Sequence, residues 1–507
     1  MTAIETGRVV AVVGTGTMGQ GIAQVALVAG HPVRLHDAMP GRAAEAATAL
    51  LARLDRLVEK GRLGPAERDA ARARLRPATH LSELADAGLV VEAVLEDLTV
   101  KRALFAALED IVGDDCVLAT NTSSLSVTAV AGGLRRPGRG VGLHFFNPAP
   151  LLPLVEVVGG FATDPRVAQD AYDTVLAWGK TPVRSEDTPG FIVNRIARPF
   201  YAEALRVYEE GGADAATIDA VLRESGGFRM GPFALTDLIG QDVNESVTRS
   251  VWEAFSYDQK FTPSLAQRRL VESGRLGRKS GRGWFPYGED AEAPAAPHTA
   301  APEAAPASVS VHGDLFSASV LPELIAEAGI DVVREDDAEP DHPGWIELPG
   351  GTRLFLADGS AADNADLPVI HFDLALDYRA ATRIALAPAS RVDEASLAHA
   401  VGLFQALGKD VSVIADVPGM IVSRTVAMLV DFALDARARG VATGEAVDTA
   451  MRLGVNYPRG PIEWGADLGA RWVLTALELL HDEYPTGRYA PSQALRRLAA
   501  ALEDDAS

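Results

Sequence analysis

Along the first 190 residues, short apolar runs alternate with stretches of helical periodicity. Residues 8–13 form a continuous apolar run that ends at a glycine, which is typical of a buried parallel strand. Further strands of the same sheet are expected at residues 31–37, 87–92, 115–119 and 140–144, with helix-period alanine and leucine over residues 41–75. Strands that alternate with helices predict a doubly wound α/β domain of the Rossmann type over residues 1–187.

The pattern changes after Pro189. Residues 193–210 and 215–224 have helical periodicity, so an all-α domain is expected over residues 188–288. Residues 289–307 are rich in alanine, proline and glutamate, which predicts a semi-extended linker. A small degenerate α/β segment is expected over residues 308–382, and a second helical domain over residues 383–507.

The second helical domain is expected because the chain repeats at an offset of 229 residues. The segment Thr188-Pro-Gly-Phe-Ile-Val-Asn-Arg195 returns as Val417-Pro-Gly-Met-Ile-Val-Ser-Arg424. Glycines and prolines recur because backbone turns need them. Glu156 becomes Ala385 and Asn194 becomes Ser423 at the same offset. A copy that keeps its turns and loses its polar groups has kept its fold without its chemistry, so the active site is expected in the N-terminal half.

Charge and composition exclude several classes of protein. The formal net charge of the 507 residues is -22, which argues against a nucleic-acid partner. The single cysteine, Cys116, excludes an internal disulfide, and the few histidines show no metal-ligand spacing, so no metal is expected. No run approaches the ~18 apolar residues of a membrane span, and the N-terminus lacks the pattern of a signal peptide. A cytoplasmic protein without a membrane partner is therefore expected.

A glycine-rich turn between the first strand and the following helix predicts a dinucleotide site. This G-x-G-x-x-G turn supplies the candidate cofactor-binding residues Gly14, Gly16, Thr17, Met18 and Gly19. The glycines allow a tight turn and close approach of a pyrophosphate to the helix N-terminus. Asp37 ends the second strand, where a carboxylate accepts from a ribose 2′-hydroxyl and repels a 2′-phosphate. NAD is therefore expected in preference to NADP.

Two groups of polar residues stand where catalysis could occur. Glu156 lies in an otherwise apolar strand, which is costly unless the carboxylate is paired. His144 ends an earlier strand, and the two could form an oriented general base, a structural ion pair, or no pair at all. Residues 121–124 (Asn-Thr-Ser-Ser) follow another strand and could either hold a substrate oxygen or cap a helix.

Taken together, these motifs resemble the NAD-dependent 3-hydroxyacyl-CoA dehydrogenases over residues 8–286. The resemblance is carried by GTGTMGQGIA from Gly14, VVEAVLEDLTVK from Val90, TNTSS from Thr120, GLHFFNPAP from Gly142, LVEVV from Leu154 and TPGFIVNR from Thr188. The tandem helical domains are similar to those of a bacterial subgroup that contains 3-hydroxyadipyl-CoA and 3-hydroxybutyryl-CoA dehydrogenases of phenylacetate-type catabolism.

The resemblance implies a role for each matching position. His144 takes the proton of the substrate 3-hydroxyl, and Glu156 orients and charges the histidine. Ser123 and Asn194 contact substrate oxygens as part of the catalytic set. Asn147 matches a further substrate-site position, and Glu96 and Lys101 match positions near the nicotinamide. The implied reaction converts (3S)-hydroxyacyl-CoA to 3-oxoacyl-CoA, with 3-hydroxyadipyl-CoA expected and 3-hydroxybutyryl-CoA as the alternative.

Other features of the resemblance concern assembly and competing classes. In relatives with one helical domain that domain mediates dimerisation, so the chain is expected either to form a homodimer or to use its second copy as an internal partner. A β-hydroxyacid dehydrogenase of the 6-phosphogluconate type would need a lysine where this chain has Asn194. A non-catalytic NAD-binding protein is the remaining alternative, and the intact set in the first copy argues against it. The CoA-phosphate contact (Lys60 or Arg62) and a cation for a distal carboxylate (Arg198, Arg229, Arg249 or Lys260) stay open.

Overall fold

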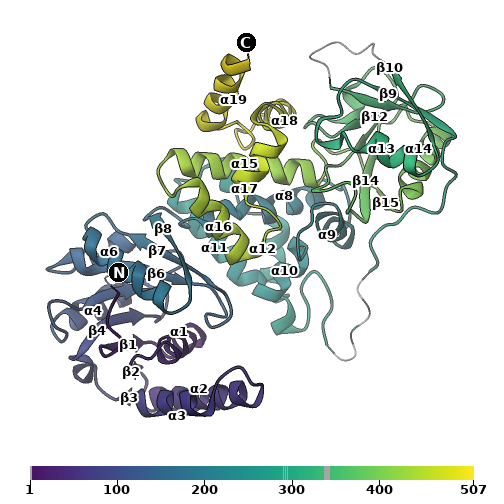
Figure 1. The fold of residues 1–507 in the computed structure, drawn as a ribbon. Helices are drawn as coiled ribbons and strands as arrows, with labels where there is room; N and C mark the ends of the chain where they lie inside the picture. The colour runs from purple at the N-terminus through teal and green to yellow at the C-terminus, as the bar shows by residue number, and fades with distance from the viewer. Residues whose placement is uncertain (1–2, 289–290, 292, 294, 336–342, 507) are drawn as a thin grey trace. The chain divides into compact units, whose positions relative to one another are not determined.

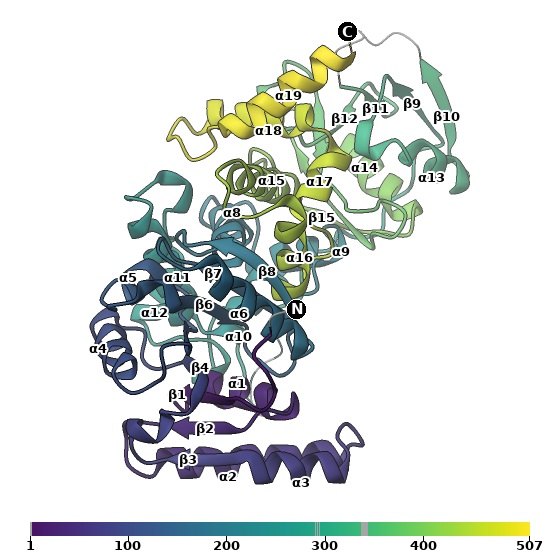
Figure 2. The same cartoon turned by 60° about the vertical axis from the view of Figure 1, so that its left-hand side comes forward.

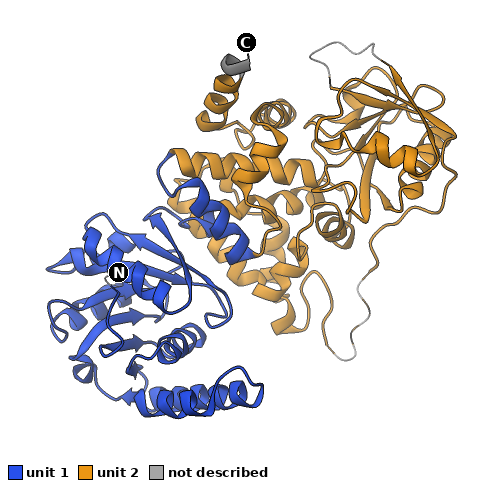
Figure 3. Cartoon of the chain, in the orientation of Figure 1, with its two compact units in different colours: residues 1–195, 439–455 blue, residues 196–438, 456–507 orange. Residues whose placement is uncertain are grey.

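The computed structural model describes residues 3–288, 291, 293, 295–335 and 343–506, which fold as two compact units (Figures 1 and 3). Unit 1 contains residues 1–195 and 439–455, and unit 2 contains residues 196–438 and 456–507. Each unit therefore draws on both halves of the chain.

Unit 1 is built on an eight-stranded sheet with the order β3-β2-β1-β4-β5-β6-β7-β8. Its strands are β1 (Val9–Val13), β2 (Val33–His36), β3 (Leu75–Ala78), β4 (Ala87–Glu92), β5 (Val117–Thr120), β6 (Gly140–Phe145), β7 (Leu154–Gly159) and β8 (Thr181–Glu186). All neighbouring strands are parallel except β6 and β7. Every residue of β1, β4, β5 and β6 is buried, as expected for a parallel sheet with both faces covered.

Helices cover both faces of this sheet. They are α1 (Thr17–Val28), α2 (Arg42–Glu59), α3 (Pro65–Arg74), α4 (Leu98–Glu109), α5 (Val127–Ala131), α6 (Pro165–Ala177), α7 (Val193–Ile196) and α16 (Gly444–Val455). Figure 2 shows α2 and α3 at the β3 edge, where α2 packs on β2 and β3. The predicted doubly wound domain is confirmed. The single helix expected over residues 193–210 is wrong, because the chain breaks between α7 and α8 just before Pro199, which lies in the first turn of α8.

Unit 2 contains helices from both copies and a second sheet. The helices are α8 (Arg198–Glu209), α9 (Ala215–Glu224), α10 (Pro232–Ile239), α11 (Gln241–Ala254), α12 (Leu265–Glu272), α13 (Leu321–Glu327), α14 (Glu394–Ala406), α15 (Val422–Ala438), α17 (Pro461–Leu468), α18 (Ala470–Glu483) and α19 (Gln493–Ala506). The strands, in sheet order, are β10 (Asp331–Glu335), β9 (Ser308–His312), β11 (Trp345–Glu347), β12 (Arg353–Leu356), β13 (Val369–Phe372), β14 (Arg383–Pro388) and β15 (Asp410–Val413).

The second sheet extends beyond the expected boundary at residue 382. Strands β14 and β15 complete it, with β14 antiparallel to β13 as β7 is antiparallel to β6. The helical part of the second copy therefore begins at α15, and the described residues between 308 and 413 form a reduced α/β body around its own apolar core. The expected linker lies partly outside the described residues. Its described part has no helix or strand, and Ala300 donates a backbone hydrogen bond to Val411 O at 2.8 Å.

Candidate active site

The glycine-rich turn has the geometry that a dinucleotide needs. Gly14 has φ +96°, and a Cβ there would lie 2.4 Å from Ala93 O, while a Cβ on Gly19 would lie 1.8 Å from Gly14 O. Gly16 instead faces open space and is the N-cap of α1, whose first turn, with Thr17 and Met18, receives no side-chain cap. Uncapped N–H groups at a helix N-terminus are the donors that a pyrophosphate requires, so these residues fit NAD.

Asp37 lies directly beside this turn. Its Oδ2 accepts hydrogen bonds from Thr15 N at 2.9 Å and from Thr15 Oγ1 at 2.7 Å. Burial alone would raise the pKa of Asp37, but the hydrogen bonds from Thr15 and Met39 hold that pKa below its usual value. The carboxylate is therefore ionised at neutral pH, in the state that disfavours a 2′-phosphate.

His144 and Glu156 face each other across the antiparallel pair β6 and β7. His144 Nδ1 lies 2.5 Å from Glu156 Oε2, and both side chains are buried. The other carboxylate oxygen, Oε1, accepts hydrogen bonds from Ile192 N at 3.0 Å and Val193 N at 2.9 Å. Because a carboxylate only accepts, the proton of the contact sits on Nδ1, and Nε2 is the nitrogen that can accept another proton. Of the three interpretations left open by the sequence, the structure rules out two unrelated residues, because the two side chains are paired.

The turn that follows β8 delivers the two backbone donors. Gly190 has φ +76° and Phe191 has φ +49°, so the chain reverses in left-handed conformations before α7 begins at Val193. The Phe191 ring lies 5.7 Å from the His144 ring, and the Phe146 ring lies 4.5 Å from it. The turn at Gly190 and Phe191 thus places the Ile192 and Val193 donors at Glu156 and one aromatic ring beside the imidazole.

An ion network with a buried Lys101–Glu92 pair and a more exposed Glu96 holds the loop with Ser123. Lys101 Nζ lies 2.6 Å from Glu92 Oε1 and 3.1 Å from Glu96 Oε2. Glu96 Oε1 in turn accepts from Ser123 N, at 3.0 Å, and from the side chains of Thr122 and Ser124. Burial opposes ionisation of Glu96, but Lys101 and these donors lower its pKa. The structure therefore engages Glu96 and Lys101 in shaping this loop, which is a role compatible with the expected cofactor contact.

Two of the three substrate-site candidates, Ser123 and Asn194, are in contact. Asn194 Nδ2 donates to Ser123 O at 3.3 Å, which brings the expected pair together. Asn147 is exposed in the loop after β6, next to Phe146. That loop is fixed by Lys180, whose Nζ donates to Ala149 O at 2.6 Å and Leu152 O at 2.9 Å.

Sequence reasoning missed three supporting residues. Glu92 is buried at the end of an apolar strand, the same signal that singled out Glu156, and it pairs with Lys101. Asn121 was noted only as part of a polar cluster, yet its Oδ1 accepts from Phe145 N at 2.9 Å. Phe146, which packs on His144, carried no signal because an aromatic residue in such a loop is usually core.

The second copy retains the backbone N–H groups that bind a carboxylate, but it has no histidine at the position of His144. Asp373, at the position of His144, accepts from Ile421 N, Val422 N and Ser423 N at 2.8–3.0 Å. Burial raises the pKa of Asp373 to about 6 against the pull of these donors. Asp373, which directly follows β13, thus supplies the carboxylate that Ala385, the equivalent of Glu156, cannot supply. Among the described residues, no histidine is paired with Asp373. The copy keeps the anion-binding turn as a structural element.

Comparison with known proteins agrees with this geometry, which is that of an NAD-dependent dehydrogenase. Residues 9–188 match the 3-hydroxyacyl-CoA dehydrogenase NAD-binding domain, residues 190–287 and 419–504 match the C-terminal domain of that family, and residues 354–418 match the 3-hydroxybutyryl-CoA dehydrogenase reduced Rossmann-fold domain. The chain belongs to the 3-hydroxyacyl-CoA dehydrogenase family, whose members are oxidoreductases, and its cofactor is NAD.

Particular relatives cover either the whole chain or its first copy. The 3-hydroxyadipyl-CoA dehydrogenase of Escherichia coli (strain K12) is 44% identical over 97% of this chain and 97% of its own length. The solved structure of a 3-hydroxybutyryl-CoA dehydrogenase from Escherichia coli K12 superimposes with a TM-score of 0.87 at 42% identity, covering 99% of this chain and 100% of that one. A 3-hydroxybutyryl-CoA dehydrogenase of Mycobacterium tuberculosis is 40% identical and covers 55% of this chain and 98% of its own.

Among the helices that the structure describes, none is long and apolar enough to cross a membrane.

Proposed function

We propose that His144 is the general base of this enzyme and that Glu156 orients and charges it. The observation that carries this proposal is the 2.5 Å contact between His144 Nδ1 and Glu156 Oε2 inside a buried strand pair. With Nδ1 bonded to the carboxylate, Nε2 accepts the proton of the substrate 3-hydroxyl. The imidazolium formed in this step is stabilised by Glu156, which two backbone N–H groups hold in place.

Other residues of the first copy orient the reaction. Ser123 and Asn194, joined by a hydrogen bond, hold the substrate oxygens, and Asn147, in the loop after β6, is a further substrate contact. The turn from Gly14 to Gly19 and Asp37 bind the cofactor, with Glu96 and Lys101 at its nicotinamide end. When bound, NAD supplies the hydride acceptor for the substrate C3. Base and cofactor must converge on one carbon, because proton and hydride leave adjacent atoms.

The replacement His144→Gln tests the base. Loss of a positioned general base lowers kcat by about 10²–10⁴-fold, whereas NADH binding, followed by its fluorescence, should be retained. Unchanged turnover would contradict the proposed role. Loss of NADH binding together with turnover would instead indicate a damaged fold, and circular dichroism of the variant checks this.

For the acyl chain we propose 3-hydroxyadipyl-CoA, as in phenylacetate-type aromatic catabolism in the cytoplasm. The support is the Escherichia coli relative of that name, which matches 97% of the chain and so includes the second copy. 3-Hydroxybutyryl-CoA is the second candidate, because the superimposable structure carries that name. Comparing kcat/KM for NADH oxidation with 3-oxoadipyl-CoA and acetoacetyl-CoA decides between them. A strong preference for the dicarboxylate supports the first, and equal or better turnover of acetoacetyl-CoA supports the second.

We also propose that the second helical copy acts as an internal partner for the first. A two-fold interface makes each contact twice with the residues exchanged. Within unit 1, Glu186 N donates to Val441 O at 2.8 Å, and within unit 2, Ala415 N donates to Gly212 O at 3.0 Å. Adding 229 to Glu186 gives Ala415, and subtracting 229 from Val441 gives Gly212, so the second hydrogen bond is the first with the two copies exchanged. Likewise α16 packs on β7 and α9 packs on β14, which are equivalent pairs at the same offset.

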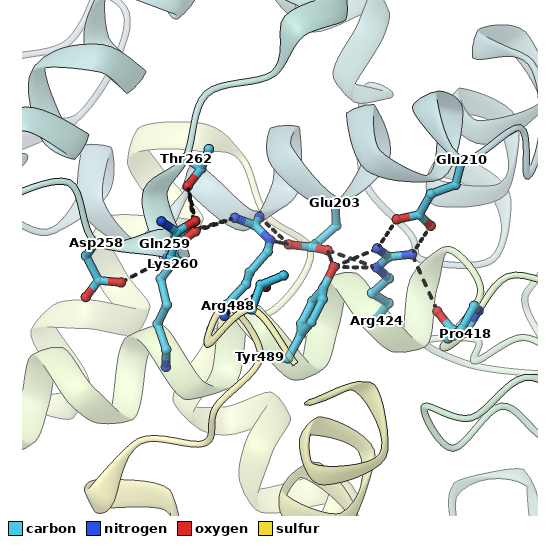
Figure 4. A network of polar contacts seen from close by, with 11 residues as sticks. Glu203, Glu210, Asp258, Gln259, Lys260, Thr262, Pro418, Arg424, Arg488 and Tyr489 are labelled. Carbon is cyan, nitrogen blue, oxygen red and sulfur yellow. Dashed lines mark hydrogen bonds and ion pairs between the residues drawn. The ribbon is translucent and has the colours of Figure 1, made fainter. Parts of the chain in front are cut away.

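Inside unit 2, equivalent helices of the two copies also contact each other. The equivalent helices α8 and α15 pack on each other. Phe432 contacts Lys260 and Phe261, while Glu203, its equivalent, contacts Tyr489 and Arg488 (Figure 4). If the second copy replaces a partner subunit, the full chain sediments as a monomer and residues 1–290 alone dimerise or aggregate. A stable monomeric 1–290 fragment would contradict the proposal.

A further inference from the structure

Helix α16 comes from the second copy but is part of unit 1, where it packs on β7 and β8. Figure 3 shows residues 439–455 in the colour of unit 1. Near the C-terminal end of this helix stands Gly454. A Cβ built on it would lie 2.7 Å from Leu154 Cδ2, 3.2 Å from Val193 Cγ2 and 3.7 Å from Phe146 Cε1.

Each of these three neighbours supports the His144–Glu156 pair. Val193 donates its backbone N–H to Glu156 Oε1 at 2.9 Å. The Phe146 ring packs on the His144 ring at 4.5 Å. Leu154 lies two residues before Glu156 on β7 and therefore points to the same face of the sheet. The residues that contact His144 and Glu156, or that lie on the same strand face, thus all lie next to Gly454.

A side chain at Gly454 fits only if its neighbours move. Leu154 and Val193 are both buried, and real Cβ atoms do not approach other atoms to 2.7 Å. Val193 is β-branched and stiff at χ1 in a helix, so its response to pressure is a shift of the backbone that carries the N–H. A methyl group at position 454 would therefore displace the Val193 N–H that donates to Glu156.

We propose that Gly454 is a positioning residue: the end of α16 holds Val193, Leu154 and Phe146 where they keep Glu156 and His144 aligned. The second copy, which has lost its own base, thereby contributes a contact on which catalysis by the first copy depends. This inference rests on the proposed role of His144. If His144→Gln retains full turnover, that role is wrong whatever Gly454 does, so the two failures are distinguishable.

The test is Gly454→Ala, with Gly454→Val as a larger step, in the full-length enzyme. Sub-ångström to ångström misplacement of catalytic groups costs up to about a hundredfold, so kcat should fall about tenfold for alanine and further for valine. KM for the acyl-CoA and for NAD should change little, because the substrate and cofactor contacts are left in place. Alanine also raises helix propensity, so the melting temperature should not fall in parallel with kcat.

Rescue separates positioning from a general loss of structure. In Leu154→Val/Gly454→Ala the added methyl group takes the volume that the shortened side chain gives up, so kcat should recover toward that of Leu154→Val alone. The matched control is Ser225→Ala, because Ser225 is the equivalent of Gly454 and faces the inactive copy, where its Oγ donates to Arg383 O at 2.6 Å. That variant should keep wild-type kcat. Folded Gly454 variants with wild-type kcat, or a double variant without recovery, would overturn the proposal.

Discussion

Replacing Glu203 by glutamine removes the charge at the centre of the cluster in Figure 4. Glu203 is fully buried on α8, and its oxygens accept from Arg488 Nη2 at 2.5 Å, Arg424 Nε at 3.0 Å and Tyr489 OH at 2.8 Å. Burial by itself would raise the pKa of Glu203. The guanidinium groups of Arg488 and Arg424 outweigh it and lower that pKa from 4.5 to about 2.

A lowered pKa in the folded state means that ionisation of Glu203 favours folding. The contribution is present above the unfolded value of 4.5 and is lost as the pH falls through that value toward the folded value of about 2. A drop of this size corresponds to about 3 kcal/mol at pH 7, of which about 2 kcal/mol remains at pH 3.5. Glu203→Gln should therefore lower the free energy of unfolding by about 3 kcal/mol or more at pH 7, because it also leaves two buried guanidinium groups under-compensated.

The assay is urea denaturation followed by circular dichroism at pH 7 and pH 3.5. The gap between wild type and Glu203→Gln should narrow by about 1 kcal/mol at the lower pH. Glu210→Gln is the comparison variant, because Glu210 pairs with the same buried Arg424 but its side chain is 24% exposed, so its loss should lower the free energy of unfolding by less than the loss of the fully buried Glu203 does. Equal stability of Glu203→Gln and wild type at pH 7, or a gap that does not change with pH, would refute the reasoning.

Three further predictions concern the site itself. Glu156→Gln should lower kcat by about a hundredfold or more, because an uncharged amide stabilises the imidazolium poorly, and stopped-flow NADH formation measures it; a change below threefold would contradict the pairing. Asp37→Asn should lower kcat/KM for NADH by about tenfold to a hundredfold, the range for a lost hydrogen bond to a charged group, while turnover with NADPH improves; an unchanged cofactor ratio would exclude Asp37 from the ribose site. Lys180→Met should lower both stability and kcat, whereas Lys409→Met, which removes the equivalent donor to Tyr378 O and Ala381 O, should cost about 1–3 kcal/mol of stability alone; loss of kcat in both would show that the lysine acts on the fold only.

Much of the first copy was predictable from the sequence because its signals are local. The strands expected at residues 8–13 and 31–37 are β1 and β2, and Gly14 in the turn after β1 has the positive φ that a tight turn favours. The repeat directed the search for the site to the first copy, since Glu156 is replaced by Ala385 at the offset of 229 residues. The position of Glu156 in an apolar strand also predicted that its carboxylate has a partner, because an unpaired charge there is costly.

The sequence determined the elements, the cofactor turn and which copy retained the catalytic side chains. Only the tertiary structure decided which residues contact each other. Glu203 pairs with Arg488, 285 residues away, and Asp373 accepts from the backbone donors of the second copy. Residues 439–455, which include Gly454, belong to unit 1. Periodicity reports which face of a helix or strand is buried, but it carries no information about what covers that face. Only the folded chain, in which segments hundreds of residues apart pack to share one core, fixes those contacts.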